Sequence, residues 1–263
     1  MGAPVRLIHN DFELQDLIET LSVDAALIER DFALVTVVAG LVNEYGNTLC
    51  FKGGFVLRHV YGHERFSKDI DATRINPPKN KLDAAEVAAT IRAASIRNLL
   101  IFNPREPATD SGRSLDFDDI PFSGPIREGH IAVEVSYRED VIETPYVAHI
   151  GEPYFEPFEI PVLQLDEIIA EKLRALVQRT RQTDLSDLAM VIERHDVHDA
   201  RVKTLAAQKF KLVKDGNHAV RIKTNIATMA AQYDSTIPAV APDAPPYKAA
   251  SAAVLSKLAA WLP

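Results

Sequence analysis

Two aspartates separated by one residue, Asp69 and Asp71, have the residue types and spacing that point most directly to chemistry. They flank Ile70 in a short stretch that predicts a β-strand, and alternate residues of a strand project from the same face. Two neighbouring carboxylates repel each other unless a cation or a basic group neutralises them. Carboxylate oxygens placed in this way suit Mg²⁺ bound against phosphate oxygens. The pair therefore predicts metal-dependent phosphoryl-transfer chemistry.

Two adjacent glycines lie upstream of the acidic pair. Gly53 and Gly54 follow the short apolar stretch 48–51, which predicts a strand, and precede residues 55–61, which predict a helix. Backbone N–H groups at such a turn, with the positive end of the helix, can hold a phosphate. Each motif alone also fits an ordinary turn. Strand, Gly-Gly, helix and Asp-x-Asp strand, in this order, follow the arrangement of the polymerase-β-like nucleotidyltransferase fold.

A third carboxylate is expected from a later strand. Glu134 lies in the stretch 131–137 and projects opposite to its apolar residues, so it would reach the polar face of a sheet. Three other acids compete for this role, and Asp116 and Asp118 share one strand face, with Asp119 next to them. The proline and glycine residues around these three acids favour a hairpin tip. We therefore assign Glu134 as the third metal ligand.

Four motifs of the chain resemble those of the AbiEii/AbiGii-type nucleotidyltransferase toxins. The first two are residues 51–58 and 65–71, which carry the glycines and the aspartates. The third and fourth are residues 165–176 and 184–188, with Arg179 between them. In addition, residues 28–32, Ile-Glu-Arg-Asp-Phe, are similar to a stretch that precedes the glycines in those proteins. The resemblance spans about residues 25–190, in the order of the family.

The resemblance implies an activity and a role for individual residues. Members transfer nucleotides from a nucleoside triphosphate, in studied cases to the acceptor end of tRNA, and a partner antitoxin restrains their toxicity. The metal would be Mg²⁺ or Mn²⁺. The implied residues are the glycines that hold the triphosphate, the aspartates that bind the metal, the lysine that contacts nucleotide phosphate and the acid of the last motif: Gly53, Gly54, Asp69, Asp71, Lys172 and Asp187.

One departure from the family pattern concerns the residue after the glycines. Related sequences commonly have Ser or Thr there, but this chain has Phe55, so the grip on the triphosphate would depend on backbone groups, Lys52 or Arg58. Arg58 lies one helical turn beyond the glycines, where it would either face phosphate or pair with Glu64. Ser67 stands two residues before the first aspartate. A continuous strand would bring it to the same pocket as a further nucleotide-binding residue.

The last two motifs also fit structural roles. Lys172 shares a helix with Glu167 and Glu171, which would suit a salt-bridged solvent face. The carboxylates of Asp184 and Asp187 could instead stabilise the amino terminus of a helix through its dipole. With the resemblance, we assign Lys172 and Asp187 to function and keep Asp184 as a structural residue.

The periodicity of apolar residues predicts the elements that must position these groups. Helical spacing recurs at 12–21, 25–42 and 82–98. Between 103 and 160 apolar residues fall in short stretches separated by Pro and Gly, which predicts a meander of strands. From Pro161 helices return, at 165–179, 185–195, 202–213 and 249–262. We therefore predict an α+β fold, with a mixed-sheet nucleotidyltransferase domain over 1–160 and a helical domain over 161–263.

Composition bounds the class of protein. Of the 263 residues, 47% are hydrophobic and 25% are charged, as expected of a globular protein with a substantial core. The net charge of −8 excludes a broad electrostatic coat for DNA. The single cysteine, Cys50, permits no internal disulfide, and we find no signal-peptide pattern and no apolar run that would span a membrane. We expect a cytoplasmic protein.

A local basic segment stands out against this acidic background. Residues 201–223 contain seven Lys or Arg residues and one acid, Asp215. Lys209, Lys211 and Lys214 within it are candidate contacts to RNA phosphates, although a solvated helix face would show the same composition.

The function predicted from these features is transfer of a nucleoside monophosphate to an RNA acceptor, the acceptor end of tRNA, by the toxin of a toxin–antitoxin pair. One alternative is a nucleotidyltransferase that modifies a protein or a small molecule. Another is a non-catalytic nucleotide-binding protein, which would have no need for the mutually repelling pair of Asp69 and Asp71. The sequence leaves the base, the acceptor and the antitoxin open.

Overall fold

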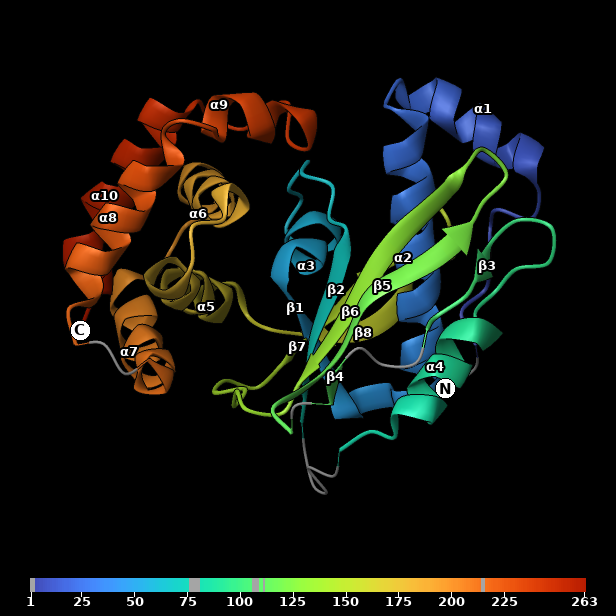
Figure 1. Ribbon diagram of the computed structural model, residues 1–263, viewed down its shortest axis with the longest axis horizontal. Helices are drawn as coiled ribbons and strands as arrows, with labels where there is room; N and C mark the ends of the chain where they lie inside the picture. Colours follow the sequence, from blue (N-terminus) through green and yellow to red (C-terminus); the bar gives the residue numbers. More distant parts are fainter. Residues whose placement is uncertain (1–2, 76–80, 106–108, 111, 214–215) are drawn as a thin grey trace. The chain divides into compact units, whose positions relative to one another are not determined.

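The computed structural model describes residues 3–75, 81–105, 109–110, 112–213 and 216–263 (Figure 1). These residues form two compact units. The first unit comprises the chain up to Val60 together with residues 66–141 and 145–162. The second comprises residues 61–65, 142–144 and 163–263. The boundary predicted after residue 160 falls inside the last strand of the first unit.

A mixed β-sheet is the framework of the first unit. Its strands are β1 (Leu49–Lys52), β2 (Asp69–Arg74), β3 (Ile101–Phe102), β4 (Thr109–Asp110), β5 (Ser114–Ser123), β6 (Glu128–Ser136), β7 (Tyr146–Ile150) and β8 (Phe158–Val162). They lie in the order β3-β5-β6-β2-β1-β8-β7, with β4 paired to β5. The pairs β2–β6 and β1–β8 are parallel. The predicted meander over 103–160 is therefore wrong, because β6 pairs with β2 and not with the strand that follows it.

The described residues of the first unit form the helices α1 (Asp11–Leu21), α2 (Ala25–Tyr45), α3 (Gly53–His59) and α4 (Ala84–Ala93). Asp24 caps the start of α2, since its side chain accepts the N–H of Ala26. From Ile28 to Val42 most residues of α2 are buried, and this helix packs along β6 and β2 (Figure 1). The predicted helix 82–98 is shorter than expected, because Asp83 caps its start and the chain turns after Ala93.

Two buried acids near the start of α2 fix this helix to the rest of the unit. Glu29 accepts the backbone N–H groups of Ile126, at 2.9 Å, and Arg127, at 3.2 Å, in the turn between β5 and β6. Glu29 is fully buried, and burial raises the pKa of its carboxyl group, while these two hydrogen bonds lower it. Glu29 therefore anchors the β5–β6 turn to α2.

Asp31 joins α2 to α3 and to the segment before β8. Its carboxylate lies 3.1 Å from Nε of Arg58, 3.1 Å from Nε2 of His59 and 3.0 Å from the hydroxyl of Tyr154. The Arg58 guanidinium also lies 3.6 Å from the centre of the Phe66 ring. Arg58 therefore helps to pack α3 through Asp31, whereas the sequence suggested phosphate or Glu64 as its partner. Its contact with phosphate stays a prediction.

The second unit is helical. Its helices are α5 (Leu165–Gln178), α6 (Gln182–Arg194), α7 (Asp199–Lys209), α8 (His218–Met229), α9 (Tyr233–Thr236) and α10 (Tyr247–Trp261). The four predicted helices are found within a few residues of their expected bounds, and α8 was not predicted. The central helix α5 contacts α6, α7 and α8, and α10 packs on α6 and α7. Within the described residues, no helix is long and apolar enough to cross a membrane.

The basic segment of this unit is only partly exposed. Lys209 is buried, and its ammonium lies 2.7 Å from Glu167 and 2.8 Å from Glu171. The expectation that Lys209 contacts RNA is therefore wrong, because its charge is used inside the helical core. Lys211 is exposed, and Lys214, the third candidate, lies outside the described residues.

We expect Glu29→Ala to lower the free energy of unfolding by about 2–4 kcal/mol, because two backbone N–H groups lose a charged acceptor. Urea unfolding at pH 7 would measure the loss. Glu19→Ala, at an exposed position of α1, is the matched control and should change the stability little. Equal stability of the two variants would contradict the anchoring role of Glu29.

Candidate active site

The strand register places four charged residues in one row across the sheet. Lys52 of β1 is opposite Asp71 of β2, Asp71 is opposite Glu134 of β6, and Glu134 is opposite Asp116 of β5. Directly opposed residues of neighbouring strands project from the same face. Asp69, two residues before Asp71, shares that face. We call Asp69, Asp71, Glu134 and Asp116 the carboxylate row.

Asp116 is the member of the row that the sequence interpretation missed. The predicted hairpin tip is wrong, because Asp116 lies within β5, and the irregularity falls after Phe117, where the register with β6 shifts. Ser114 donates a hydrogen bond to Oδ2 of Asp116 at 2.8 Å, while Oδ1 is buried without a hydrogen-bond partner among the described residues. The sequence did contain a signal for a strand here, because Asp116 alternates with the apolar residues Leu115 and Phe117, which are both buried.

The electrostatics of the row favour a cation. Burial raises the pKa of the Glu134 carboxyl group, Lys52 lowers it, and the negative charges of Asp116 and Glu139 raise it further. The Lys52 ammonium is itself buried in an ion pair with Glu139. The positive charge of Lys52 is therefore shared between Glu134 and Glu139, and carboxylates arranged in this way would suit a divalent metal.

Gly53 determines how closely Asp71 approaches the start of α3. Its φ is +73°, and a Cβ added there would collide with Oδ2 of Asp71 and lie 3.0 Å from Cγ. A residue with a side chain would push the carboxylate away. Lys52 occupies the N-cap position of α3, and no side chain caps the helix. The backbone N–H groups at Gly53 and Gly54 therefore begin a helix next to a carboxylate of the row.

Ser67 lies just before β2. The strand begins at Asp69, so the continuous strand that would bring Ser67 to the face of the aspartates is not formed. The serine is buried, and its hydroxyl lies 3.1 Å from the backbone oxygen of Asp69 and 3.2 Å from Oδ1 of the same residue. Ser67 thus holds the first aspartate of the row, and its contact with nucleotide stays a prediction.

The third and fourth motifs form a buried charge network in the second unit. The Lys172 ammonium lies 2.9 Å from Asp184 and 2.7 Å from Asp187. Asp187 also accepts two hydrogen bonds from Arg65, at 2.6 and 3.0 Å, and Asp184 accepts two from Arg179, at 2.7 and 3.2 Å. Lys172 is therefore not part of a solvent face with its helical neighbours, and Asp184 is as deeply engaged as Asp187. We call these five residues the C-terminal charge network.

Opposite charges keep the members of this network ionised. Burial alone would lower the pKa of Lys172, but Asp184 and Asp187 raise it well above its ordinary value. Burial would raise the pKa of the Asp184 carboxyl group, but Lys172 and Arg179 hold it well below its ordinary value. An ammonium group has three N–H donors, and the two acids use two of them.

A buried imidazole lies beside this network. The ring of His63 stacks on that of His195, with centroids 5.6 Å apart, and neither ring nitrogen of His63 has a hydrogen-bond partner among the described residues. Burial lowers the pKa of His63 to about 4, with Asp187 opposing this effect and the cation of Arg65 contributing to it. His63 is therefore neutral at pH 7.

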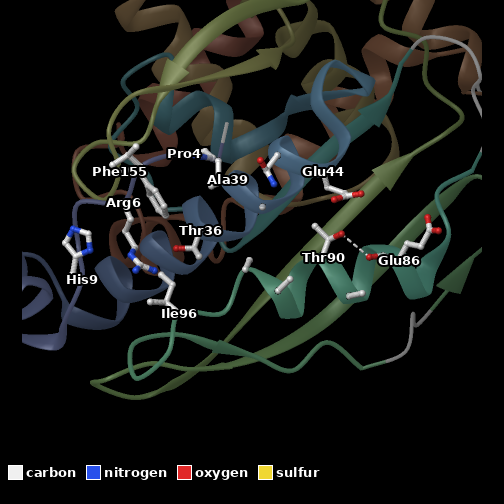
Figure 2. A pocket seen from close by; sticks show the side chains of 17 residues that line it. Pro4, Arg6, His9, Thr36, Ala39, Glu44, Glu86, Thr90, Ile96 and Phe155 are labelled. Atoms are coloured by element: carbon white, nitrogen blue, oxygen red, sulfur yellow. Dashed lines mark hydrogen bonds between the residues drawn. The ribbon is translucent and has the colours of Figure 1, made fainter. Parts of the chain in front are cut away.

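A separate cavity of about 840 Å³ lies in the first unit, between α2, α4 and the amino-terminal segment (Figure 2). Its walls include the small residues Ala39 and Ala89, with Arg6 on one side of the view and Glu44 and Glu86 on the other. No member of the carboxylate row lines it. The predicted chemistry therefore does not reside in this cavity.

A family model described as the nucleotidyl transferase AbiEii toxin of type IV toxin–antitoxin systems matches residues 39–257. The chain belongs to this family. It is therefore a nucleotidyltransferase family enzyme, as the motifs predicted, and the match extends past the resemblance found in the sequence, into the last helices. Membership implies a nucleoside triphosphate as substrate and an antitoxin as partner. No curated protein sequence matches the chain.

Solved structures confirm the fold. MenT4, a nucleotidyltransferase toxin from Mycobacterium tuberculosis H37Rv, superposes with a TM-score of 0.71 at 19% identity, covering 94% of this chain and 89% of MenT4. A Helicobacter pylori protein described as a candidate nucleotidyltransferase gives 0.61 at 17% identity, covering 89% and 94%. JHP933 from Helicobacter pylori gives 0.56 at 18% identity, covering 88% and 90%. The predicted nucleotidyltransferase fold with a helical carboxy-terminal region is thus confirmed.

We expect Gly53→Ala to reduce nucleotide transfer by about 100-fold or more, because the new Cβ displaces Asp71 and catalytic geometry tolerates shifts of only about 1 Å. Gly46→Ala is the matched control, since Gly46 also has a positive φ, of +51°, but nothing lies within 4 Å of an added Cβ. Both variants carry the backbone strain, roughly 1–2 kcal/mol. The transfer rates of the two folded variants would separate the effect of backbone strain from that of the collision with Asp71. Equal rates would contradict the idea that Gly53 makes room for Asp71.

We expect His63→Phe to make the protein less sensitive to mild acid. With a folded pKa of about 4 and an ordinary value of 6.5, His63 takes up a proton between these pH values only in the unfolded chain. The wild type therefore loses stability as the pH falls through this range, by roughly 1–2 kcal/mol at pH 5 from this group. Thermal unfolding at pH 7 and pH 5 should show a smaller drop for the variant. An equal drop in both proteins would contradict the assignment.

Proposed function

We propose that the enzyme transfers a nucleoside monophosphate from a nucleoside triphosphate to an RNA acceptor, the acceptor end of tRNA, and releases pyrophosphate. The observation that carries this proposal is the contact of Asp71 with Gly53, next to Glu134 on the neighbouring strand. It brings a metal-binding carboxylate to a helix start whose N–H groups suit phosphate. The family resemblance of the motifs supports an RNA acceptor.

The metal would be Mg²⁺ or Mn²⁺, held by Asp69, Asp71 and Glu134. The donor set fits, because hard oxygen ligands suit these ions. Among the described residues no three His, Cys, Asp or Glu side chains converge as a complete metal site. Mg²⁺ in enzymes of this type is commonly bound by one or two carboxylates together with substrate phosphates, so a complete protein cage is not required. When bound, the ion neutralises negative charge on the triphosphate and the leaving pyrophosphate.

The remaining steps fall to side chains and backbone groups of the chain. The N–H groups at Gly53 and Gly54 would orient the triphosphate. Glu134 would either help to hold the metal or, if it does not bind the ion, accept the proton of the attacking hydroxyl. Lys52, bound to Glu139, would hold positive charge beside Glu134.

Lys172 and Asp187 are proposed as functional residues of the second unit. Lys172 would contact a phosphate oxygen through its ammonium group, which Asp184 and Asp187 keep positively charged. Asp187 would orient that ammonium, since it contacts Lys172 directly and is itself fixed by Arg65. Of the three lysines named from the sequence, the exposed Lys211 remains a candidate for contact with RNA phosphates.

We expect Asp71→Asn to reduce transfer by about 100-fold or more, because the amide cannot supply the negative charge that the metal needs. The purified protein would be incubated with each labelled nucleoside triphosphate, Mg²⁺ or Mn²⁺ and total RNA, and labelled products separated on a gel. Asp118→Asn is the control, because Asp118 is an exposed residue of β5 outside the row.

Label incorporated into tRNA by the wild type and by Asp118→Asn, but not by Asp71→Asn, would support the proposal. Label in protein or in a small molecule instead of RNA would contradict the acceptor and leave the transfer chemistry standing. Wild-type rates in Asp71→Asn would overturn the metal assignment.

A further inference from the structure

In the stretch Glu29-Arg30-Asp31 at the start of α2, the side chains of the two acids connect α2 to other elements, whereas no such contact is found for Arg30 among the described residues. Glu29 is buried and holds the β5–β6 turn, and Asp31 is buried and holds α3 and Tyr154. Both neighbours of Arg30 are therefore fixed by their own contacts. Because Arg30 lies between two anchored residues of a helix, its backbone is held in place before any ligand binds.

Arg30 itself is half-buried, and its Nε has no hydrogen-bond partner within the described part of the chain. Its Nε is buried, and no hydrogen bond or ion pair joins the side chain to any residue that the structure describes. A buried cation without a partner is unfavourable, and burial accordingly lowers the pKa of the Arg30 guanidinium. The negative charges of Asp31 and then Asp69 oppose this effect. The guanidinium is thus within electrostatic reach of the first aspartate of the carboxylate row.

Other arginines of the chain have a structural role and form ion pairs with a carboxylate. Arg58 is bound by Asp31, Arg65 by Asp187, and Arg127 by Asp24 at 3.1 Å. Each has a carboxylate that compensates its charge. Arg30 has no such partner, although Asp31 is its neighbour in sequence, because the Asp31 carboxylate is already used by α3 and Tyr154. The folded chain therefore holds a desolvated guanidinium that an incoming anion would compensate.

We propose that Arg30 is a further substrate-binding residue, which contacts the phosphate groups of the nucleoside triphosphate beside Asp69. The inference rests on the proposed function. A triphosphate bound with its metal at Asp69 and Asp71 brings negative charge next to this guanidinium. The planar fork of arginine suits two phosphate oxygens at once, which a lysine cannot match. Arg30 would also supply a side-chain contact to phosphate in a chain that has Phe55 where related sequences commonly have the hydroxyl of Ser or Thr.

The test is equilibrium binding of each of the four nucleoside triphosphates with Mg²⁺, measured calorimetrically without acceptor. Arg30→Met keeps the aliphatic stem and removes the charge, and should weaken binding by about 10- to 100-fold, the range expected for charge-assisted hydrogen bonds. Arg30→Lys should recover part of the affinity. Arg127→Met is the matched control, because it removes a nearby arginine charge that is already paired with Asp24, and its affinity should equal that of the wild type.

Thermal unfolding without nucleotide separates binding from folding. Arg30→Met should melt at or above the wild-type temperature, because an uncompensated buried cation has been removed, and should gain less stability from added nucleotide. If Arg30→Met fails to fold, Arg30→Lys carries the test, and reduced affinity at wild-type stability supports the proposal.

Each result decides a different point. Wild-type affinity in Arg30→Met would overturn the role of Arg30 and leave the proposed function intact. Equal weakening in Arg127→Met would overturn it as well, because the effect would then reflect general charge. Absence of nucleotide binding by the wild type would overturn the proposed function itself.

Discussion

Gly53 allows the Asp71 carboxylate to lie against the backbone at the start of α3, because a Cβ at this position would collide with the carboxylate. The positive φ of Gly53 turns the chain from β1 into α3, and the same turn leaves room for the aspartate of the next strand. The parallel pairing of β2 with β6 then sets Glu134 beside Asp71. One steric condition thus links the strand order, the start of a helix and the alignment of the acids.

Buried charge is used in both units to fix one element against another. In the first unit, Glu29 and Asp31 attach α2 to a turn of the sheet and to α3. In the second, Lys172 and Asp187 connect α5 with α6. Such groups are unfavourable to bury unless fully partnered, so each tolerates few alternative arrangements. The consequence for function is a set of rigid supports around side chains that must bind highly charged substrates.

Local pattern predicted much of this site, and the parts it missed depend on contacts distant in sequence. Alternation along a strand was enough to place Asp69, Asp71 and Glu134 on one face. It could not show that β6 lies beside β2, because the register of a parallel pair is set by packing far along the chain. Asp116 was missed for the same reason. The proline near it indicated a turn, and only the pairing of β5 with β6 shows that Asp116 lies within a strand. Lys209 was read as exposed because composition does not reveal the acids of another helix.

The C-terminal charge network has a consequence for the response of the protein to ionic strength. Mobile ions screen charges that face solvent, but they screen buried pairs much less. The pairs of Lys172 with Asp184 and Asp187 lie inside the helical unit and should persist in concentrated salt. Contacts between exposed residues such as Lys211 and a polyanion weaken steeply under the same conditions. Salt would therefore weaken the binding of a polyanion at such exposed residues, while the buried pairs of the network would be affected much less.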